Sequence, residues 1–133
     1  MTNEPCKFCA IAAGTSDAEV VAVTDQCIAF VPIDMASKGH LLLIPKDHYE
    51  TILDIPNETL ESLMVFAKNL SFSLQTKTEV SGVNLLHASG ESAQQSVQHF
   101  HIHLLPRFDK DGLDAWPKLP GSREKLEVLH EFI

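Results

Sequence analysis

The sequence predicts an α+β fold in which a mostly antiparallel sheet packs against one long central helix. Short apolar segments of strand length occur in clusters, between residues 19 and 45 and between residues 82 and 105. A longer segment, 55–77, has apolar residues at helical spacing. The chain has 133 residues, 44% of them hydrophobic, which is enough for one well-formed core. We therefore expect a single domain over residues 1–133.

The first part of the chain predicts a short helix and three strands. Residues 6–14 are typical of a short helix or turn that ends at Gly14. Segments 19–24 and 27–31 predict two strands joined at Asp25-Gln26 as a hairpin. Segment 39–45 contains the continuous apolar run Leu-Leu-Leu-Ile, which predicts a fully buried strand.

The second part predicts the central helix and two more strands. Apolar residues recur at helical spacing over 55–77, namely Leu60, Leu63, Met64, Ala67, Leu70 and Leu74. We interpret this stripe as core, and Asp54 or Asn57 as the N-cap. Segments 82–86 and 99–105 predict strands. After Pro106 the chain is rich in Asp, Pro and Gly until a short helical pattern near 123–130.

Charge and hydropathy exclude several functional classes. Ten basic against eighteen acidic residues give a net charge of −8, which disfavours binding to a nucleic-acid polymer. A small phosphate-bearing ligand is still compatible, because histidines and backbone amides can form a local anion site. No apolar run is long enough to span a bilayer, so no membrane association is expected. The first nine residues do not resemble a secretion signal, so we expect a cytoplasmic protein.

Residues 99–105 read His-Phe-His-Ile-His-Leu-Leu, with three histidines at strict alternation. Successive side chains of an extended segment point to opposite faces, so His99, His101 and His103 share one face about 6–7 Å apart. The other face carries apolar residues that suit the core, namely Phe100, Ile102 and Leu104. A strand that only had to fold would carry Thr, Lys or Glu on its outer face. We therefore interpret the row of imidazoles as the chemical centre.

The segment from Gln95 to Leu105 resembles the signature of the histidine triad (HIT) hydrolases and transferases of nucleotides, Gln-x-Val-x-His-φ-His-φ-His-φ-φ, where φ is apolar. The similarity extends to Cys-Lys-Phe-Cys at 6–9, to residues 39–48, to the central helix and to Asn84-Leu-Leu. It implies the HIT-like fold, with a sheet of about five strands and two helices, and a homodimer. The tail, about residues 107–133, would pack on the domain or on the dimer partner.

The resemblance implies that His101 is the catalytic nucleophile. It would attack the α-phosphorus of a nucleotide and form a covalent nucleotidyl-histidine, which water then hydrolyses. A neutral imidazole suits this role, because its ordinary pKa near 6.5 leaves it largely deprotonated at neutral pH. Substrates would be nucleotide phosphoramidates, acyl-nucleotides or dinucleoside polyphosphates. His103 favours a hydrolase, because the transferases of the family tend to carry glutamine there.

The resemblance also implies a set of substrate-binding residues around His101. His40 and His103 would contact phosphate oxygens or assist proton movement. Gln95 and Ser96 would reach the phosphate or the leaving group, and Ser96 is a candidate donor to a departing amine. Ile33 would pack against the base.

Cys6-x-x-Cys9 can bind a metal ion, because two thiolates three residues apart in a turn converge on a tetrahedral site. Zinc-binding relatives have ligands at places that correspond to Cys6, Cys9, His48 and His99. Four protein ligands would complete the coordination shell, so the zinc would be structural. A thioredoxin-like redox role is disfavoured, since no βαβ unit surrounds the pair. Cys27 is interpreted as a buried apolar residue.

The chain departs from the family pattern at the nucleoside end. Pro32 stands where relatives often have the acidic residue that binds the ribose hydroxyls, and its ring cannot replace it. Asp34 is a possible substitute if the loop shifts. Ala88 replaces a common asparagine, and Gln94 stands where glycine is usual, while Gly90 is kept.

Two other functions fit the same residues. The first is a metal-dependent hydrolase in which His99 and His101 are paired ligands of an open catalytic site, because two histidines at i, i+2 can bind one ion. The second is a nucleotide-binding regulatory module with weak activity, in line with Pro32, Ala88 and Gln94.

Overall fold

The computed structural model describes residues 5–132, so residues 1–4 and 133 of the expected domain lie outside the described residues. The regular elements, in chain order, are α1 (Lys7–Ala12), β1 (Glu19–Val23), β2 (Cys27–Val31), β3 (Leu41–Pro45), α2 (Asn57–Lys77), β4 (Gly82–Leu86), the 3-10 turn η1 (Glu91–Ala93), β5 (Ile102–Arg107) and the 3-10 turn η2 (Glu127–Glu131). None of these helices has the length and apolar character that a membrane span requires. The cytoplasmic location stays a prediction.

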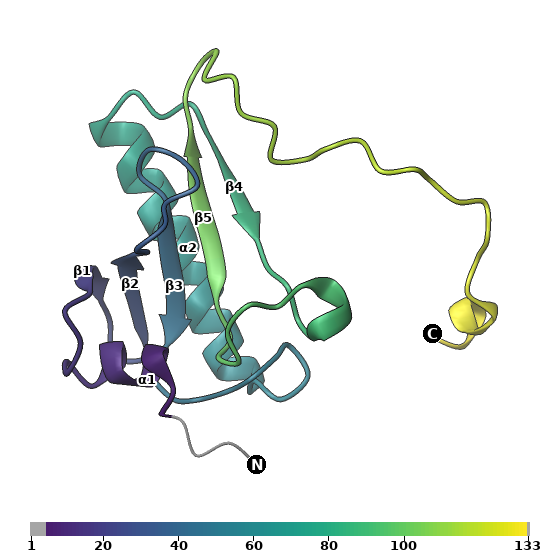
Figure 1. The fold of residues 1–133 in the computed structure, drawn as a ribbon, viewed down its shortest axis with the longest axis horizontal. Helices are drawn as coiled ribbons and strands as arrows, with labels where there is room; N and C mark the ends of the chain where they lie inside the picture. Colours follow the sequence, from purple (N-terminus) through teal and green to yellow (C-terminus); the bar gives the residue numbers. More distant parts are fainter. Residues whose placement is uncertain (1–4, 133) are drawn as a thin grey trace.

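The strands form one open sheet in the order β1-β2-β3-β5-β4, with every neighbouring pair antiparallel. The long helix α2 crosses one face of this sheet, and α1 lies near its lower end in Figure 1. The predicted α+β class, five strands, one long helix and a short N-terminal helix are confirmed. The register pairs Leu42 of β3 with His103 of β5, which brings the first half of the chain beside the histidine row.

Apolar residues on the two faces of the sheet form two cores. One core joins the sheet to α2, with Phe100, Ile102 and Leu104 packed beside Leu63 and Phe66. The other core joins the sheet to α1, and its buried members are Phe8, Ile11, Ile28, Phe30, Leu42 and Ile44. The predicted alternation is therefore right: the apolar residues between the histidines face α2, and Phe8 of the other core contacts the rings of His99 and His101.

Several predicted boundaries are wrong, each for a local reason. Strand β5 begins only at Ile102, because the backbone N–H of Phe100 donates to the carbonyl of Tyr49 rather than to a neighbouring strand. Of the three histidines, only His103 is therefore in the strand. The N-cap of α2 is Pro56, which makes no side-chain cap bond, so Asp54 and Asn57 do not have this role.

Asp54 has another use in the turn before α2. Its carboxylate accepts the backbone N–H groups of Glu50 and Thr51, at 3.1 and 2.7 Å, and thereby holds the loop that follows β3. These hydrogen bonds keep the pKa of Asp54 below its usual value. The turn carries His48 and Tyr49 toward the histidine segment.

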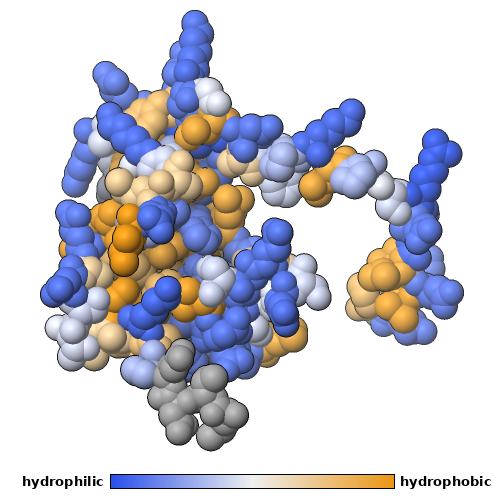
Figure 2. Space-filling model, in the orientation of Figure 1, coloured by the Kyte–Doolittle hydropathy of each residue, from blue (hydrophilic) through white to orange (hydrophobic). Residues whose placement is uncertain are grey.

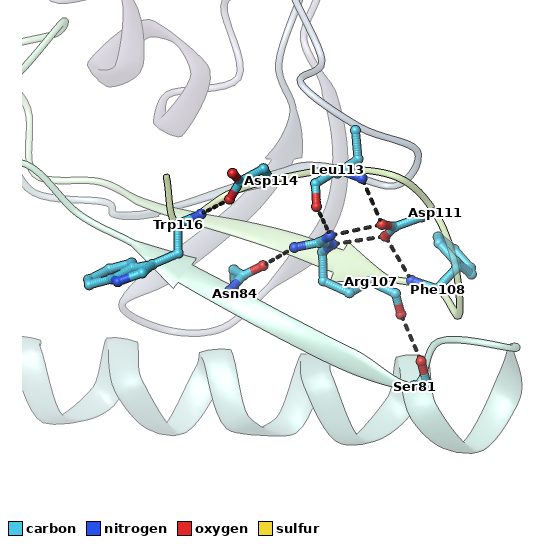
Figure 3. Close-up of polar contacts among 8 residues, drawn as sticks. All are labelled: Ser81, Asn84, Arg107, Phe108, Asp111, Leu113, Asp114 and Trp116. Atoms are coloured by element: carbon cyan, nitrogen blue, oxygen red, sulfur yellow. Dashed lines mark hydrogen bonds and ion pairs between the residues drawn. The ribbon is translucent and has the colours of Figure 1, made fainter. Parts of the chain in front are cut away.

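The segment after β5 runs away from the sheet (Figure 1). It begins at a polar cluster in which the Arg107 guanidinium donates to Asn84 Oδ1 and to both carboxylate oxygens of Asp111, each at 2.8 Å (Figure 3). The carboxylate also accepts the N–H groups of Phe108 and Leu113. Beyond this cluster the backbone has no regular structure until η2, where the sequence predicted a short helix.

Candidate active site

One end of the sheet, between α1 and the segment before β5, holds a cavity of about 480 Å³. Its floor is apolar and consists of Phe8, Ile11, Phe30, Val31, Leu42 and Val97. Polar groups lie at its edges, with Ser96, His101 and His103 from the signature segment and Lys7, Asp17 and Asp34 from elsewhere in the chain. An apolar cavity with a few polar groups is the usual form of a small-molecule site.

His101 is fixed in one tautomer. Its Nδ1 lies 2.8 Å from the backbone carbonyl oxygen of His99, and a carbonyl only accepts, so Nδ1 carries the proton and Nε2 has the lone pair. The residue is 3% exposed. Nε2 of His101 makes no hydrogen bond to a described residue. It is not fully buried either, because Ser37 Oγ is the one fully buried side-chain polar atom of the described residues that lacks a partner. Nε2 is therefore accessible from the cavity that His101 lines. Burial lowers the pKa of His101, which keeps the ring neutral and nucleophilic.

The other expected substrate residues occupy two kinds of position. Ser96, His103 and Ile33 line the cavity, and Ile33 is fully exposed there. An exposed isoleucine at the edge of a cavity is free to pack against a ligand. His40 and Gln95 are buried and do not line it.

Both the oxygen and the nitrogen of the Gln95 side-chain amide make hydrogen bonds, and these bonds connect three loop segments. Its Oε1 accepts the N–H of Gly90 at 2.7 Å, and its Nε2 donates to the carbonyls of Glu50 and Val97 at 2.7 and 2.9 Å. The preceding Gln94 has φ of 69°, a left-handed conformation that glycine adopts without strain. Gln94 therefore adopts a left-handed conformation at a position where the resemblance implies glycine.

A second cluster lies where α1, the turn after β3 and the histidine row meet. The donor atoms of Cys6, Cys9, His48 and His99 all lie within 4.8 Å of one another. Nδ1 of His99 is 3.4 Å from Cys6 Sγ, 3.5 Å from Cys9 Sγ and 3.2 Å from His48 Nδ1. A tetrahedral zinc ion with ordinary bond lengths gives N–N and N–S separations of about 3.3 and 3.5 Å. The donor set and its dimensions therefore fit zinc.

The surroundings of His99 also suit a metal ligand. Its Nε2 donates to the carbonyl oxygen of Pro45 at 2.9 Å, so the proton is on Nε2 and the lone pair of Nδ1 faces the cluster. Burial lowers the pKa of His99, which favours the neutral form that metals require. Burial and the neighbouring Cys6 raise the pKa of Cys9 to about 11, so a cation is what would ionise this thiol.

Sequence reasoning missed several residues around these sites. Lys7 lies between the two cysteines, and Asp17 lies in the loop before β1, yet both line the cavity. His87 donates from Nδ1 to the carbonyl oxygen of His101 at 2.8 Å and stacks on Phe100. The only signal for His87 was the high histidine count, seven in the chain, with one of them at the end of a predicted strand.

The chain is similar to several known proteins. The family model described as "HIT domain" matches residues 13–110. The chain is 35% identical over 130 residues to "Protein hit" of Bacillus subtilis, covering 97% of this chain and 90% of the relative. It is 36% identical over 128 residues to the adenosine 5'-monophosphoramidase HNT1 of Saccharomyces cerevisiae, covering 95% of this chain and 78% of the relative.

A solved structure with the same architecture comes from Mycobacterium smegmatis. It is described as a zinc-bound histidine triad family protein, with a TM-score of 0.79 and 29% identity, and the match covers 83% of this chain and 80% of that chain.

Proposed function

Because this chain belongs to the HIT family, we propose that it is a hydrolase that cleaves nucleotides at the α-phosphorus, with His101 as the nucleophile. One observation carries this proposal: the unprotonated Nε2 of His101 opens onto a cavity whose apolar floor suits a base. The phosphoramidase activity of the yeast relative supports the same class of reaction for this chain.

The reaction has two displacements. In the first, Nε2 of His101 forms a bond to phosphorus, the bond from phosphorus to the leaving group breaks, and the leaving group takes up a proton from solvent water that enters the cavity or from a group other than His101 and His103. The ring becomes positively charged, and its Nδ1–H donates to the His99 carbonyl, which stabilises that charge. In the second, water attacks phosphorus, the P–N bond breaks, and the nucleoside monophosphate leaves.

The substrate class that we propose is nucleotides whose α-phosphate carries an amine, an acyl group or a second nucleotide. Ser96 and His103 line the cavity beside His101, where a phosphate bound to His101 would lie. Ile33 is placed to pack on a base. Asp34 and Asp17 are the carboxylates of the cavity, and either could accept ribose hydroxyls in place of the residue that Pro32 replaces.

A trapped adduct tests the nucleophile directly. We expect intact-mass spectrometry of protein quenched during turnover of adenosine 5'-phosphoramidate to detect one nucleotidyl group per chain, located at His101 by peptide mapping. A panel of aminoacyl and amine-linked nucleotides would then narrow the leaving group. If the protein turns over substrate rapidly and carries no nucleotidyl adduct on any residue at early quench times, covalent catalysis is contradicted.

We also propose that Cys6, Cys9, His48 and His99 hold one structural zinc ion. All four positions of a tetrahedron are then taken by protein ligands, so the ion has no site for substrate or water. The zinc would tie α1 and the turn after β3 to the histidine row. The cluster of possible metal ligands among the described residues contains His99 but not His101, which supports a structural ion over a catalytic one.

We propose further that residues 1–133 form one domain that assembles as a homodimer, with the tail of each chain on the other copy. The tail exposes Trp116, Leu119 and Leu126, with Trp116 79% exposed, although apolar side chains of this size normally find a partner. Figure 2 shows hydrophobic residues gathered at the far end of the tail. Strand β4 is an edge strand, paired with β5 on one side and with no strand of the described residues on the other, and Phe72 of α2 is 66% exposed.

The dimer is testable by sedimentation. We expect the full chain to sediment as a dimer, and Phe72→Glu to give a folded monomer because it places a charge in the apolar interface. Trp116→Asp should weaken the dimer less, since it removes one contact of the tail only. A monomeric wild-type protein at micromolar concentration would rule out the assembly.

A further inference from the structure

Two histidines from opposite halves of the chain form a pair behind the cavity. His40, which precedes β3, is 4% exposed, whereas His103 of β5 lines the cavity. Nε2 of His40 lies 2.9 Å from Nδ1 of His103. Nδ1 of His40 lies 3.0 Å from the backbone N of Ala36. Both nitrogens of His40 are therefore engaged within the protein.

The backbone amide of Ala36 fixes the protons of this chain of contacts. An amide N–H only donates, so Nδ1 of His40 must accept, and the ring proton of neutral His40 lies on Nε2. That proton is donated to Nδ1 of His103. The proton of His103 must then lie on its Nε2, which makes no hydrogen bond to any described residue and is not buried.

The same contacts exclude a protonated His103. An imidazolium would carry a proton on Nδ1, and this proton would need a lone pair on Nε2 of His40. His40 would then have lone pairs on both nitrogens, because its Nδ1 already accepts from Ala36. Such a ring is an imidazolate, which does not form near neutral pH. Burial, followed by the charges of neighbouring histidines, also lowers the pKa of His103 to about 4.

We propose that His40 is a positioning residue that fixes His103 as a neutral hydrogen-bond donor, with its Nε2–H directed at a phosphoryl oxygen of the substrate. This proposal rests on the proposed function and adds to it the exclusion of His103 as the general acid. A neutral ring that gave up its Nε2 proton would become an imidazolate. The hydrogen bonds that lead to His103 begin at the backbone amide of Ala36, which is too weak an acid to supply a proton through His40. The leaving group must therefore be protonated by a different group or by solvent.

The tautomer of His103 can be measured without any activity. In the full-length protein labelled with ¹⁵N-histidine, two-bond ¹H–¹⁵N spectra at pH 7.5 should show His103 in the Nε2–H form. The His103 signal is assigned by its loss in His103→Gln. In His40→Phe the donor to Nδ1 is gone, so both tautomers of His103 should appear. His40→Gln places an amide donor near the position of Nε2 and should restore the single form.

Kinetics add the functional half of the test. His40→Phe should lower kcat/KM for adenosine 5'-phosphoramidate about tenfold, the worth of one hydrogen bond, and His40→Gln should recover part of it. His103→Gln, a neutral donor that cannot transfer a proton, should retain more activity than His103→Leu. An Nδ1–H or protonated His103 in the wild-type spectrum overturns the proposal, even if His40→Phe fails to fold. If no nucleotide is turned over, the proposed function is overturned. The NMR spectra then decide the proposal about the tautomer of His103 by themselves.

Discussion

Replacing His101 by asparagine should reduce kcat/KM for a nucleotide phosphoramidate by about four orders of magnitude or more, because no other group in the cavity can replace a positioned nucleophile. The asparagine amide can still donate to the carbonyl of His99, as Nδ1–H of His101 does. The fold should therefore persist, with a thermal midpoint near that of the wild type. The readouts are steady-state kinetics, melting, and capture of the nucleotidyl adduct.

Comparison with His101→Ala separates chemistry from structure. Alanine leaves a cavity in place of a buried ring and deprives the His99 carbonyl of its donor, which costs about 1–3 kcal/mol. Both variants should lack the adduct, but only the alanine variant should lose stability. An asparagine variant with activity within tenfold of the wild type would refute the assignment of His101 as nucleophile.

The core of the fold could be predicted because its signals are periodic and local. Alternation along residues 99–105 and the helical stripe of α2 each report which side chains face the core. The alternation is found as predicted, but the stripe is wrong at Met64, which is 44% exposed, while Phe66 is buried in the core instead. The boundaries failed where tertiary contacts override local preference. The carbonyl of Tyr49 delays the start of β5, and the Asp54 carboxylate serves the preceding turn instead of capping α2.

The candidate site was predictable only in part, for a different reason. The signature segment is contiguous in the sequence, so His101, His103 and Ser96 could be named together. The pairing of His40 with His103 joins residues 63 positions apart, and the tautomer depends on a backbone amide that carries no sequence signal. No sequence motif points to Lys7 or Asp17. They line the cavity because α1 and the loop before β1 are placed beside it.

The proposed function assigns different charges to the groups that would bind the nucleoside and the groups that would bind the phosphate. His101 and His103 are kept neutral by burial, which lowers the pKa of both rings. The charged residues that line the cavity are one lysine and two aspartates, namely Lys7, Asp17 and Asp34. A ligand with hydroxyl groups to donate and an apolar ring to bury matches this arrangement. The reactive group and the recognising groups therefore come from different parts of the chain, so one can change while the other is kept.

Removal of the metal distinguishes the proposed mechanism from a metal-dependent hydrolase. If zinc is structural, a zinc-depleted protein kept below its melting temperature should still turn over substrate and form the adduct at His101. A catalytic ion bound by His99 and His101 would instead make the rate proportional to zinc content. The position of Nδ1 of His99, facing Cys6 and Cys9, favours the first outcome.

Cys6→Ser should abolish zinc binding and destabilise the protein, because it removes one of four ligands. The serine hydroxyl can still accept the N–H of Cys9 at the N-terminus of α1, as Cys6 Sγ does, so the loss of stability reports the metal and not the helix cap. Binding to the folded state alone contributes about 4 kcal/mol when the ligand is present at about a thousand times its Kd. The wild type should therefore gain this stability on zinc addition, and the variant should not.

Cys27→Ala is the matched control, since this buried cysteine lies outside the cluster. It should lose stability through packing alone, while its zinc content and its response to added zinc stay as in the wild type. Equal zinc content in Cys6→Ser and the wild type, measured by atomic absorption, would show that the four residues do not form the site.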